Sequence, residues 1–348
     1  MKPLLVVHNN INRRLSGVLE YALYGTECEF LRLPCPPGAL RARKVVFALS
    51  LGEYGMDSEL YELLLWLRRD ASAMEGSAAV MIIDGQGELY TKHLAQMLAL
   101  AANGAGCLFP GKPLVEATGS LENLRTLSRR MEIPLETAYL QLTRELTERL
   151  AAFAAPKFEQ PELLMLHASE KRTSNTLAIG ERVCALLDGD FGIREISLQN
   201  GRIHDCRGCS YKTCSHFAQS NGCFYGGSIV DEVFPALLQS NALLLLCPNY
   251  NDSVSANIMA FINRLTALLV NNSLYDKYVY SVVVSGYSGS DIVAQQTLGA
   301  LCLNKTLMLP PRFAFMLTAN DPGDAMRAAR VDERIAEFAA RMRRQLMS

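Results

Sequence analysis

Short apolar segments of strand length alternate with helical segments along this whole chain. In the second half, strands are expected near residues 162–167, 191–198, 242–247, 277–285 and 307–317. They are mostly continuous runs of Val, Leu and Ile, which is typical of strands buried on both faces of a parallel sheet. Helices are expected near 175–188, 228–240, 254–270, 290–303 and 323–346. The alternation predicts an α/β fold with helices on both faces of the sheet.

The first half shows the same alternation. Its strands are expected near 3–8, 28–33, 44–49, 78–84 and 106–116. Its helices are expected near 12–24, 56–69, 88–103 and 120–154, the last with a break around Pro134. The helix before the third strand is shortened or missing. Five strands with their helices in each half fit a doubly wound, flavodoxin-like sheet.

Three short segments of the first half recur in the second. Leu4–His8 recurs as Leu163–His167, Val80–Gly85 as Val282–Gly286, and Phe109–Pro110 as Leu309–Pro311. The later pairs are farther apart than the first, which indicates an insertion in the second half where a group of cysteines lies. The repeat predicts two tandem flavodoxin-like domains, 1–155 and 156–348, joined by a linker that contains two prolines.

Composition excludes several classes of protein. The chain of 348 residues is too long for one small core, and its net charge of −1 without runs of like charge gives no sign of nucleic-acid or anionic-membrane binding. No apolar segment approaches the roughly 20 residues that span a bilayer. The apolar start is too short for a signal peptide. We therefore expect a cytoplasmic protein whose ten cysteines are thiols or metal ligands and not disulfides.

Four of the ten cysteines lie in one loop, residues 204–226. They are Cys206, Cys209, Cys214 and Cys223, with the spacing C-x2-C-x4-C-x8-C. Thiolates are nucleophiles, redox groups and soft metal ligands, and one loop of this length can surround one metal centre. The alternative is a chance cluster of reduced structural cysteines. The other six, at positions 28, 35, 107, 184, 247 and 302, are expected to be small buried hydrophobic residues.

Three loops of the second half follow strands whose carboxyl ends meet at one edge of the predicted sheet, where such folds bind ligands. His167–Thr176 offers hydroxyls, an amide, two cations and a helix start, which suit a phosphate. Cys247–Ser253 offers an aromatic ring and polar groups, and the glycines of Ser285–Gly289 permit close approach of a flat ligand. Each loop by itself is also explained as a helix start or a turn.

With these motifs in order, the second half resembles the NADPH-dependent FMN reductases of flavodoxin-like fold, and specifically the iron–sulfur flavoproteins among them. The resemblance covers about residues 161–320. It rests on Ala168–Arg172 with Asn175-Thr176, on the cysteine loop, on Pro248-Asn-Tyr250, and on the helix that follows from Ser255 to Arg264.

The resemblance implies a non-covalently bound FMN. Its phosphate would be held by Ser169, Arg172, Ser174, Asn175 and Thr176. The isoalloxazine would lie against Pro248, Asn249, Tyr250, Asn251 and Ser253, and against Ser285, Gly286, Tyr287 and Gly289. Tyr250 and Tyr287 are candidates for shielding the ring or bonding to it. Cys206, Cys209, Cys214 and Cys223 would hold a [4Fe–4S] cluster, with zinc and free thiols as alternatives because their spacing is wider than in cluster-binding relatives.

The implied function is an FMN-dependent NAD(P)H oxidoreductase. Electrons would pass from NADH or NADPH through FMN, and through the cluster where present, to an acceptor that the sequence does not identify. No side chain is nominated as a catalytic acid or base. The alternatives are a non-enzymatic electron carrier or redox sensor with a cysteine-bound metal, and a zinc-stabilised binding protein without flavin.

The first half lacks the motifs that carry this chemistry. Its first loop has no Asn-Thr pair, its third-strand loop has no Pro-x-Tyr, and it has no cysteine loop, although the glycine loop Asp84–Glu88 is retained. Because flavin reductases of this family pair as dimers, we expect this degenerate copy to pair with the second within one chain, with further oligomerisation left open. Residues 157–348 alone would then self-associate or lose FMN affinity. The alternative is a partner-binding module.

Overall fold

The computed structural model describes residues 2–55 and 57–348. The chain forms two compact units, Met1–Ala154 and Ala155–Ser348. Met56, at which a helix was expected to begin, lies outside the described residues.

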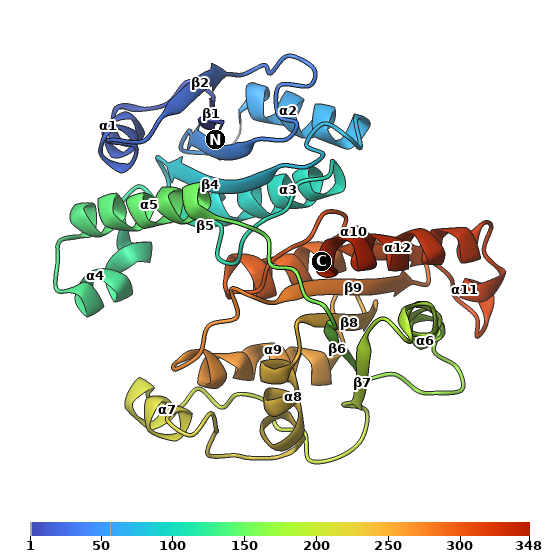
Figure 1. Ribbon diagram of the computed structural model, residues 1–348. Coiled ribbons are helices and arrows are strands. Elements are labelled where there is room, and N and C mark those ends of the chain that lie inside the picture. The colour runs from blue at the N-terminus through green and yellow to red at the C-terminus, as the bar shows by residue number, and fades with distance from the viewer. Residues whose placement is uncertain (1, 56) are drawn as a thin grey trace. The chain divides into compact units, whose positions relative to one another are not determined.

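The first unit is built around a five-stranded parallel sheet (Figure 1). Its strands are β1 (Leu4–His8), β2 (Cys28–Arg32), β3 (Lys44–Leu51), β4 (Ala78–Gly85) and β5 (Leu114–Ala117), in the order β2-β1-β3-β4-β5. In β1, Val6 pairs with Phe30 of β2 on one side and with Val46 of β3 on the other. The central strands are buried almost throughout because helices cover both faces, whereas the edge strand β2 is largely exposed.

Five α-helices belong to the first unit in the part of the chain that the structure describes. They are α1 (Arg13–Ala22), α2 (Ser58–Arg69), α3 (Thr91–Gly104), α4 (Arg125–Met131) and α5 (Leu135–Ala152). α1 packs with α5, and α2 packs with α3 on the opposite face (Figure 1). The Asn12 side chain caps α1 by accepting a hydrogen bond from the Leu15 amide. Pro134 separates α4 from α5, as the sequence predicts, and residues 33–43 form no helix.

The second unit repeats this strand order. Its strands are β6 (Glu162–His167), β7 (Gly192–Ser197), β8 (Ala242–Pro248), β9 (Tyr278–Ser285) and β10 (Ala314–Thr318), in the order β10-β9-β8-β6-β7. Numbered along each unit, both sheets have the order 2-1-3-4-5 that defines a flavodoxin-like sheet. The predicted fold class, two tandem doubly wound α/β sheets, is confirmed.

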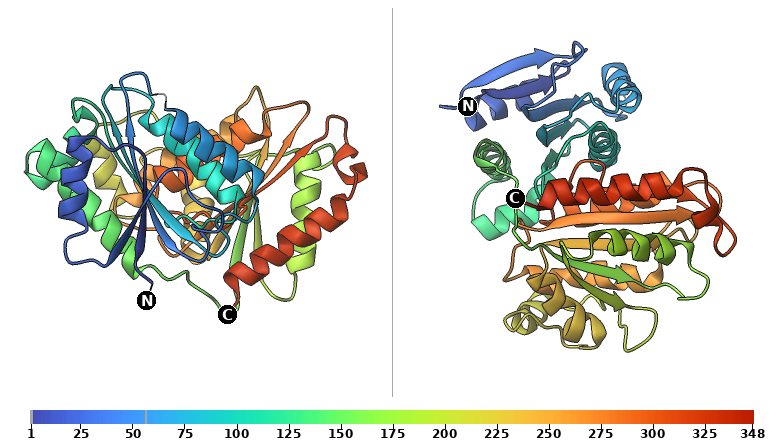
Figure 2. Two further views of the ribbon diagram at one scale, coloured as in Figure 1. Left: turned by 90° about the horizontal axis from the view of Figure 1, so that it is seen from above. Right: turned by 45° about the vertical axis from the view of Figure 1, so that its right-hand side comes forward.

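Helices lie on both faces of the second sheet (Figure 2). They are α6 (Asn175–Leu187), α7 (Tyr211–Ala218), α8 (Phe234–Gln239), α9 (Ala256–Leu269), α10 (Ser290–Leu298), α11 (Asp324–Arg327) and α12 (Val331–Leu346). α6 packs with α12 on one face, and α8 and α9 lie on the other (Figure 1). π-helical segments precede α8 at Ile229–Val233 and follow α10 at Gly299–Leu303.

Two sequence expectations need correction. The last strand of each unit is shorter than predicted, because residues 106–113 and 307–313 contribute only the single bridges Ala78–Leu108 and Tyr278–Met308. Prolines follow both bridges and lack the N–H that would continue a strand. Helix α7, inside the cysteine loop, was not expected, since its eight residues are too few to show a clear helical period.

None of the helices in the described part of the chain is both long enough and apolar enough to cross a membrane.

Candidate functional site

The candidate site of the second unit lies at the carboxyl edge of its sheet. β6, β8 and β9 are neighbours and run parallel, so the loops that follow them start at the same edge. The strand order reverses between β6 and β8, which is where doubly wound sheets bind their ligands. The predicted phosphate loop and both predicted isoalloxazine loops therefore begin at one edge.

Ser169, in the loop after β6, carries a buried hydroxyl. The residue is 2% exposed, and its Oγ has no hydrogen-bond partner among the described residues. An unsatisfied buried hydroxyl is unfavourable by roughly 1–3 kcal/mol. The loop leads into α6, whose first backbone N–H groups have no partner within the helix and attract anions. Ser169 and the start of α6 together fit a bound phosphate.

His167, the last residue of β6, orients the loop that follows this strand. Its imidazole is fully buried, and its Nδ1 accepts a hydrogen bond from the Ser169 amide at 3.2 Å. The ring hydrogen must then lie on Nε2, which donates to the Glu195 carboxylate at 3.2 Å. This pair fixes the backbone at Ser169.

The other predicted phosphate residues have different surroundings. Ser174 caps α6 by accepting from the Leu177 amide at 3.1 Å, and Arg172 is exposed at the loop surface. Thr176 is buried in the first turn. Asn175 has a role that the sequence did not predict: its amide donates to the Asp321 carbonyl at 2.9 Å and accepts from the Gly323 and Ala325 amides. Its side chain thus holds the turn before α11.

The loops after β8 and β9 are joined by Asn249. Its Nδ2 donates to Ser285 Oγ at 3.0 Å and to the Ser288 carbonyl at 3.1 Å. Its Oδ1 accepts from the Asp252 amide at 2.8 Å. Ser253 is held by hydrogen bonds to Gln296 in α10. Since these bonds cross between neighbouring strands, the two predicted isoalloxazine loops form one connected surface.

Glycine is required at one position of this surface. Gly289 has a φ of +89°, and a Cβ there would lie 2.1 Å from Asp252 Oδ1. At Gly286, a Cβ would lie 2.8 Å from Asn320 Oδ1. The spaces beside these two glycines are therefore occupied by the side chains of Asp252 and Asn320.

Two tyrosines extend from the same loops into solvent. Tyr250 is 55% exposed and Tyr287 is 84% exposed. In the loop that carries Tyr250, Pro248 ends β8 and Asn251 has a left-handed backbone with φ +53°. Large exposed aromatic side chains beside a polar edge are available to cover a flat aromatic ligand.

The four loop cysteines line a single pocket of about 260 Å³. Cys206 and Cys209 are exposed and precede α7, Cys214 lies on α7, and Cys223 follows it. Burial raises the pKa of the Cys214 thiol, and negative charge at the other three cysteines raises this pKa further. The thiols are thus close enough to affect one another.

Helix α9 forms the opposite wall of this cysteine pocket. Asn263 donates to Asp205 Oδ1 at 3.0 Å, and that oxygen also accepts from the Cys206 amide. Beyond the helix, Asn271 donates to the Ala218 carbonyl at 2.8 Å, at the end of α7. The cysteine loop is therefore held to α9 near the start of the loop, and to the segment after α9 at the end of α7.

The spacing of the thiols bears on what they could hold. No group of three or more His, Cys, Asp or Glu within the described residues is compact enough to hold a single ion. A single zinc ion needs all its sulfurs about 2.3 Å away, whereas an iron–sulfur cluster places its thiolates around a larger core. As they stand, the four thiols are not grouped as the ligands of one ion.

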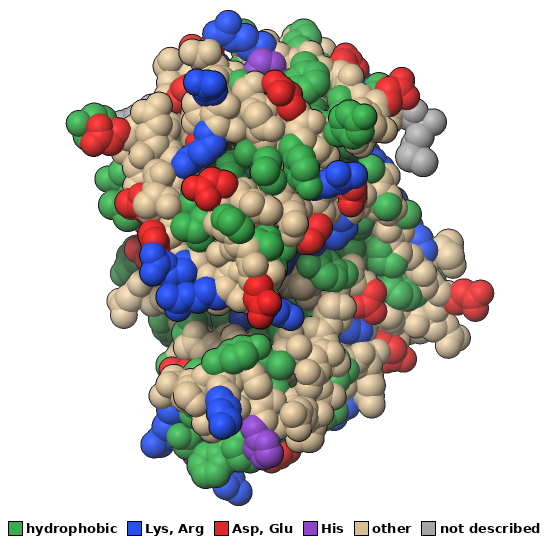
Figure 3. Space-filling view, turned by 90° about the vertical axis from the view of Figure 1, so that its left-hand side faces the viewer, with side chains coloured by type: hydrophobic (Ala, Val, Ile, Leu, Met, Phe, Trp, Pro, Cys, Tyr) green, Lys and Arg blue, Asp and Glu red, His purple; other side chains and the backbone are tan. Residues whose placement is uncertain are grey.

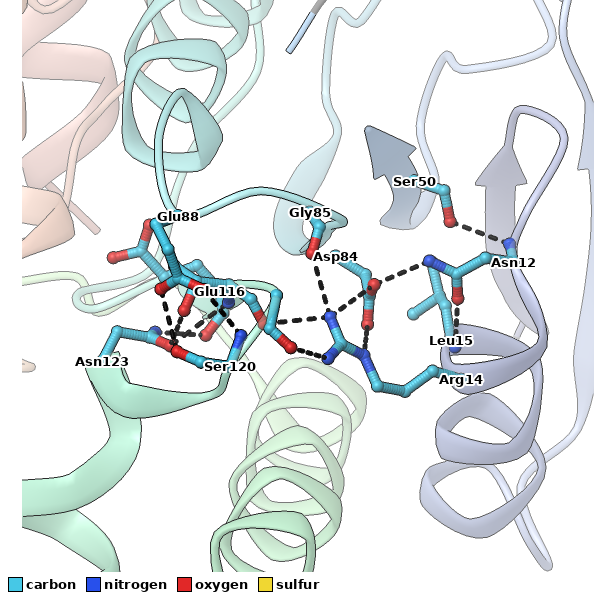
Figure 4. Close-up of polar contacts among 12 residues, drawn as sticks. Asn12, Arg14, Leu15, Ser50, Asp84, Gly85, Glu88, Glu116, Ser120 and Asn123 are labelled. Atoms are coloured by element: carbon cyan, nitrogen blue, oxygen red, sulfur yellow. Dashed lines mark hydrogen bonds and ion pairs between the residues drawn. The ribbon is translucent and has the colours of Figure 1, made fainter. Parts of the chain in front are cut away.

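The matching edge of the first unit is closed by its own side chains (Figure 4). Arg14, from α1, bonds to the buried Asp84 carboxylate through Nε and Nη2, both at 2.9 Å. Its guanidinium also donates to the carbonyls of Gly85, Thr118 and Gly119. Asn12 adds a bond of 2.7 Å to the same carboxylate. These groups join the segments that follow β1, β4 and β5.

Surface charge does not form a patch of one sign on the face shown in Figure 3, where basic and acidic side chains are interspersed. This distribution agrees with the net charge of −1.

The sequence interpretation missed several residues of the two sites. Arg14 and Asp84 are 70 residues apart, and nothing local indicates their pairing. Arg264, which lines the cysteine pocket, could have been noticed because it falls on the apolar stripe of α9 with Phe261 and Leu268. His167 could have been noticed as a polar residue that ends an apolar strand.

Comparisons with known proteins concern mainly the second unit. Residues 161–320 match the family model described as NADPH-dependent FMN reductase. No curated protein matches the sequence.

Several solved structures share the fold over about half of this chain. RosB with a bound 8-demethyl-8-formylriboflavin-5'-phosphate intermediate is 14% identical, covers 53% of this chain and 81% of its own, and has a TM-score of 0.43. An NAD(P)H:quinone oxidoreductase from Methanothermobacter marburgensis is 16% identical, with coverages of 53% and 95% and a TM-score of 0.41. An azoreductase from Bacillus anthracis str. Sterne is 13% identical, with coverages of 52% and 98% and a TM-score of 0.34. At these levels the structural similarity carries no information on activity. Through residues 161–320, the second unit matches the NADPH-dependent FMN reductases, a family of NAD(P)H-dependent oxidoreductases.

Proposed function

We propose that the second unit binds FMN at the carboxyl edge of its sheet and that the protein is an FMN-dependent NAD(P)H oxidoreductase. The observation that carries the proposal is the buried Ser169 hydroxyl without a partner, beside the first turn of α6. A phosphate oxygen would accept a hydrogen bond from this hydroxyl, and the amides of the helix start would stabilise the negative charge. The family match of residues 161–320 supports the same ligand.

The phosphate end would be held mostly by groups that the structure already orients. His167 fixes the Ser169 backbone, and the Ser174 side chain caps the start of α6 by accepting from the Leu177 amide. Arg172 is exposed and free to approach a phosphate from solvent. Asn175 would contribute through its backbone N–H, since its side chain holds residues 321–325.

The ring end would lie on the surface formed by the loops after β8 and β9. Asn249 joins these loops through its hydrogen bonds to Ser285 and Ser288, and Gly289 has no side chain that would keep a flat ring from the backbone. Tyr250 and Tyr287 would cover the ring and exclude water from it. When bound, FMN supplies hydride acceptance from NAD(P)H and release of electrons to an acceptor.

We further propose that the four cysteines hold a [4Fe–4S] cluster. The proposal is supported by the convergence of the four cysteines on one pocket, which is also lined by the buried Arg264, whose Nε and Nη2 have no hydrogen-bond partner among the described residues. Such a cluster supplies one-electron transfer.

Helix α9 would connect the two cofactors. It begins at Ala256, directly after the loop that follows β8, and its residue Arg264 lines the cysteine pocket. At 1.5 Å per residue these positions are about 12 Å apart along the helix axis. A rigid helix would thus hold the two centres at a fixed separation.

The test uses the full-length protein purified anaerobically. Flavin absorption at about 450 nm is expected, and it should bleach on stoichiometric addition of NADH or NADPH. Protein that binds no FMN would disprove the proposal. Protein whose flavin is reduced by dithionite but by neither nicotinamide would instead be an electron carrier.

A further inference from the structure

Arg264 is a cation in the interior of the second unit. It lies in α9 between Phe261 and Leu268, which are fully buried, and is itself only 2% exposed. Its side chain lines the pocket into which the four cysteines converge. An arginine is seldom buried so completely without an ionic partner.

The guanidinium of Arg264 is only partly satisfied. Nη1 donates to the His204 carbonyl at 3.3 Å, whereas Nε and Nη2 are buried and have no hydrogen-bond partner in the described part of the chain. Of the described residues that line the pocket, two are arginines and none is an aspartate or glutamate. The positive charge of Arg264 is therefore not balanced by any carboxylate of the pocket.

A buried charge without a partner strongly destabilises a fold. The imbalance therefore predicts that the pocket holds negative charge in the working protein. Four thiolates carry more negative charge than the cluster core carries positive charge, so the complete centre is anionic. Arginine keeps its proton in proteins and presents its N–H donors in a fixed plane, which suits sulfur acceptors on one side of such a centre.

We propose that Arg264 is the charge partner of the cysteine-held cluster and raises its reduction potential. This inference rests on the cluster proposed above. Reduction adds one negative charge to the centre, so a fixed buried cation stabilises the reduced form more than the oxidised form. Nε and Nη2, which have no hydrogen-bond partner among the described residues, are the donors that would face the sulfurs. Arg264 is thus a positioning and charge-balancing residue.

The first experiment compares potentials in full-length protein purified anaerobically with its FMN. Arg264→Gln removes the charge and keeps hydrogen-bonding capacity, and Arg264→Lys keeps the charge. Arg207→Gln is the matched control, because Arg207 lines the same pocket but is exposed and screened by solvent. The cluster potential is measured by spectroelectrochemical titration, and iron and sulfide are counted in each variant.

We expect Arg264→Gln to reduce the ratio of reduced to oxidised cluster at least tenfold at a given potential, a shift of about 59 mV for one electron. Arg264→Lys should restore most of this shift, and Arg207→Gln should change the potential much less. The flavin potential should stay the same in all three.

The second experiment uses thermal unfolding and covers the case in which a variant loses its cluster. In metal-free protein, Arg264→Met should leave the melting temperature unchanged or raise it, because an unbalanced buried cation is removed. In protein reconstituted with iron and sulfide, the same substitution should lower it. A merely structural arginine would stabilise both forms alike.

Different outcomes would disprove the cluster and the role of Arg264. Wild-type protein that retains no iron, or that binds zinc, would disprove the cluster itself. Wild-type protein with a cluster whose potential shifts equally in Arg264→Gln and Arg207→Gln would overturn the role of Arg264 and leave the cluster in place.

Discussion

The two units share one strand order but differ at the edge where such sheets bind ligands. In the first unit, Arg14 joins the Asp84 carboxylate and the carbonyls of neighbouring loops. In the second, no hydrogen bond in the described chain joins loop 168–174 to the loops after β8 and β9, and the buried Ser169 hydroxyl has no partner. The comparison shows that the fold alone does not specify a site: side chains of the loops decide whether the same edge is closed or available.

The largest expected difference concerns metal. Replacing Cys206, Cys209, Cys214 or Cys223 singly with Ser should abolish or strongly reduce cluster content, since each thiolate is a ligand in the proposed centre. Cys184→Ser in the same unit and Cys35→Ser in the first should retain full iron and sulfide. Equal iron loss from Cys35→Ser would contradict the assignment of metal to the second unit alone.

The next effect concerns the stability of the first unit. Arg14→Met should lower its free energy of unfolding by about 3 kcal/mol, because the Asp84 carboxylate, 0% exposed, would lose its charged partner. Denaturant unfolding measures the change. The control is Arg182→Met in the second unit, where an exposed pair with Asp332 at 3.7 Å should contribute less than about 1 kcal/mol. An equal effect of both variants would show that the Arg14 pair does not stabilise the closed edge.

The exposed cysteines of the loop should also react faster with alkylating reagents than Cys35 and Cys184. Burial raises the pKa of Cys35 to about 11, and burial followed by the charges of Glu195 and Glu181 raises that of Cys184 to about 12. Only the thiolate reacts, so at pH 8 Cys35 should be alkylated roughly a hundredfold and Cys184 roughly a thousandfold more slowly than an ordinary exposed thiol. Both should react faster as the pH rises toward their pKa. In metal-free protein, mass spectrometry should find the exposed Cys206 and Cys209 labelled before Cys35 and Cys184. Labelling of Cys35 at the same rate would refute this order.

The smallest expected effect concerns FMN affinity. Ser169→Ala should weaken FMN binding about tenfold to a hundredfold, because one hydrogen bond to a charged phosphate is lost. Quenching of flavin fluorescence measures the dissociation constant. Ser16→Ala, in the corresponding region of the first unit, is the matched control and should leave it unchanged. An equal loss from both would mean that FMN does not bind the second unit alone.

The strand framework could be predicted from sequence because it depends on local composition. Continuous apolar runs such as Leu243–Leu246 form buried parallel strands wherever helices cover both faces, and the positions of β6, β8 and β9 followed from this pattern alone. The loops of the candidate site were found in the same way, since each directly follows such a strand. The cysteine spacing also predicted, without the fold, that one loop could surround one centre.

The partners of polar side chains depended on tertiary structure. Asn175 was expected at a phosphate, but the fold brings residues 321–325 within its reach, and its amide bonds to them. Arg14 meets Asp84 only because β1 and β4 lie in one sheet with a single strand between them. Arg264 lines the cysteine pocket only because the cysteine loop, residues 204–226, folds back over α9. Apolar burial is nearly independent of which neighbours provide it, whereas a hydrogen bond or ion pair needs one particular partner at one distance and angle, and in this protein those partners come from distant parts of the chain.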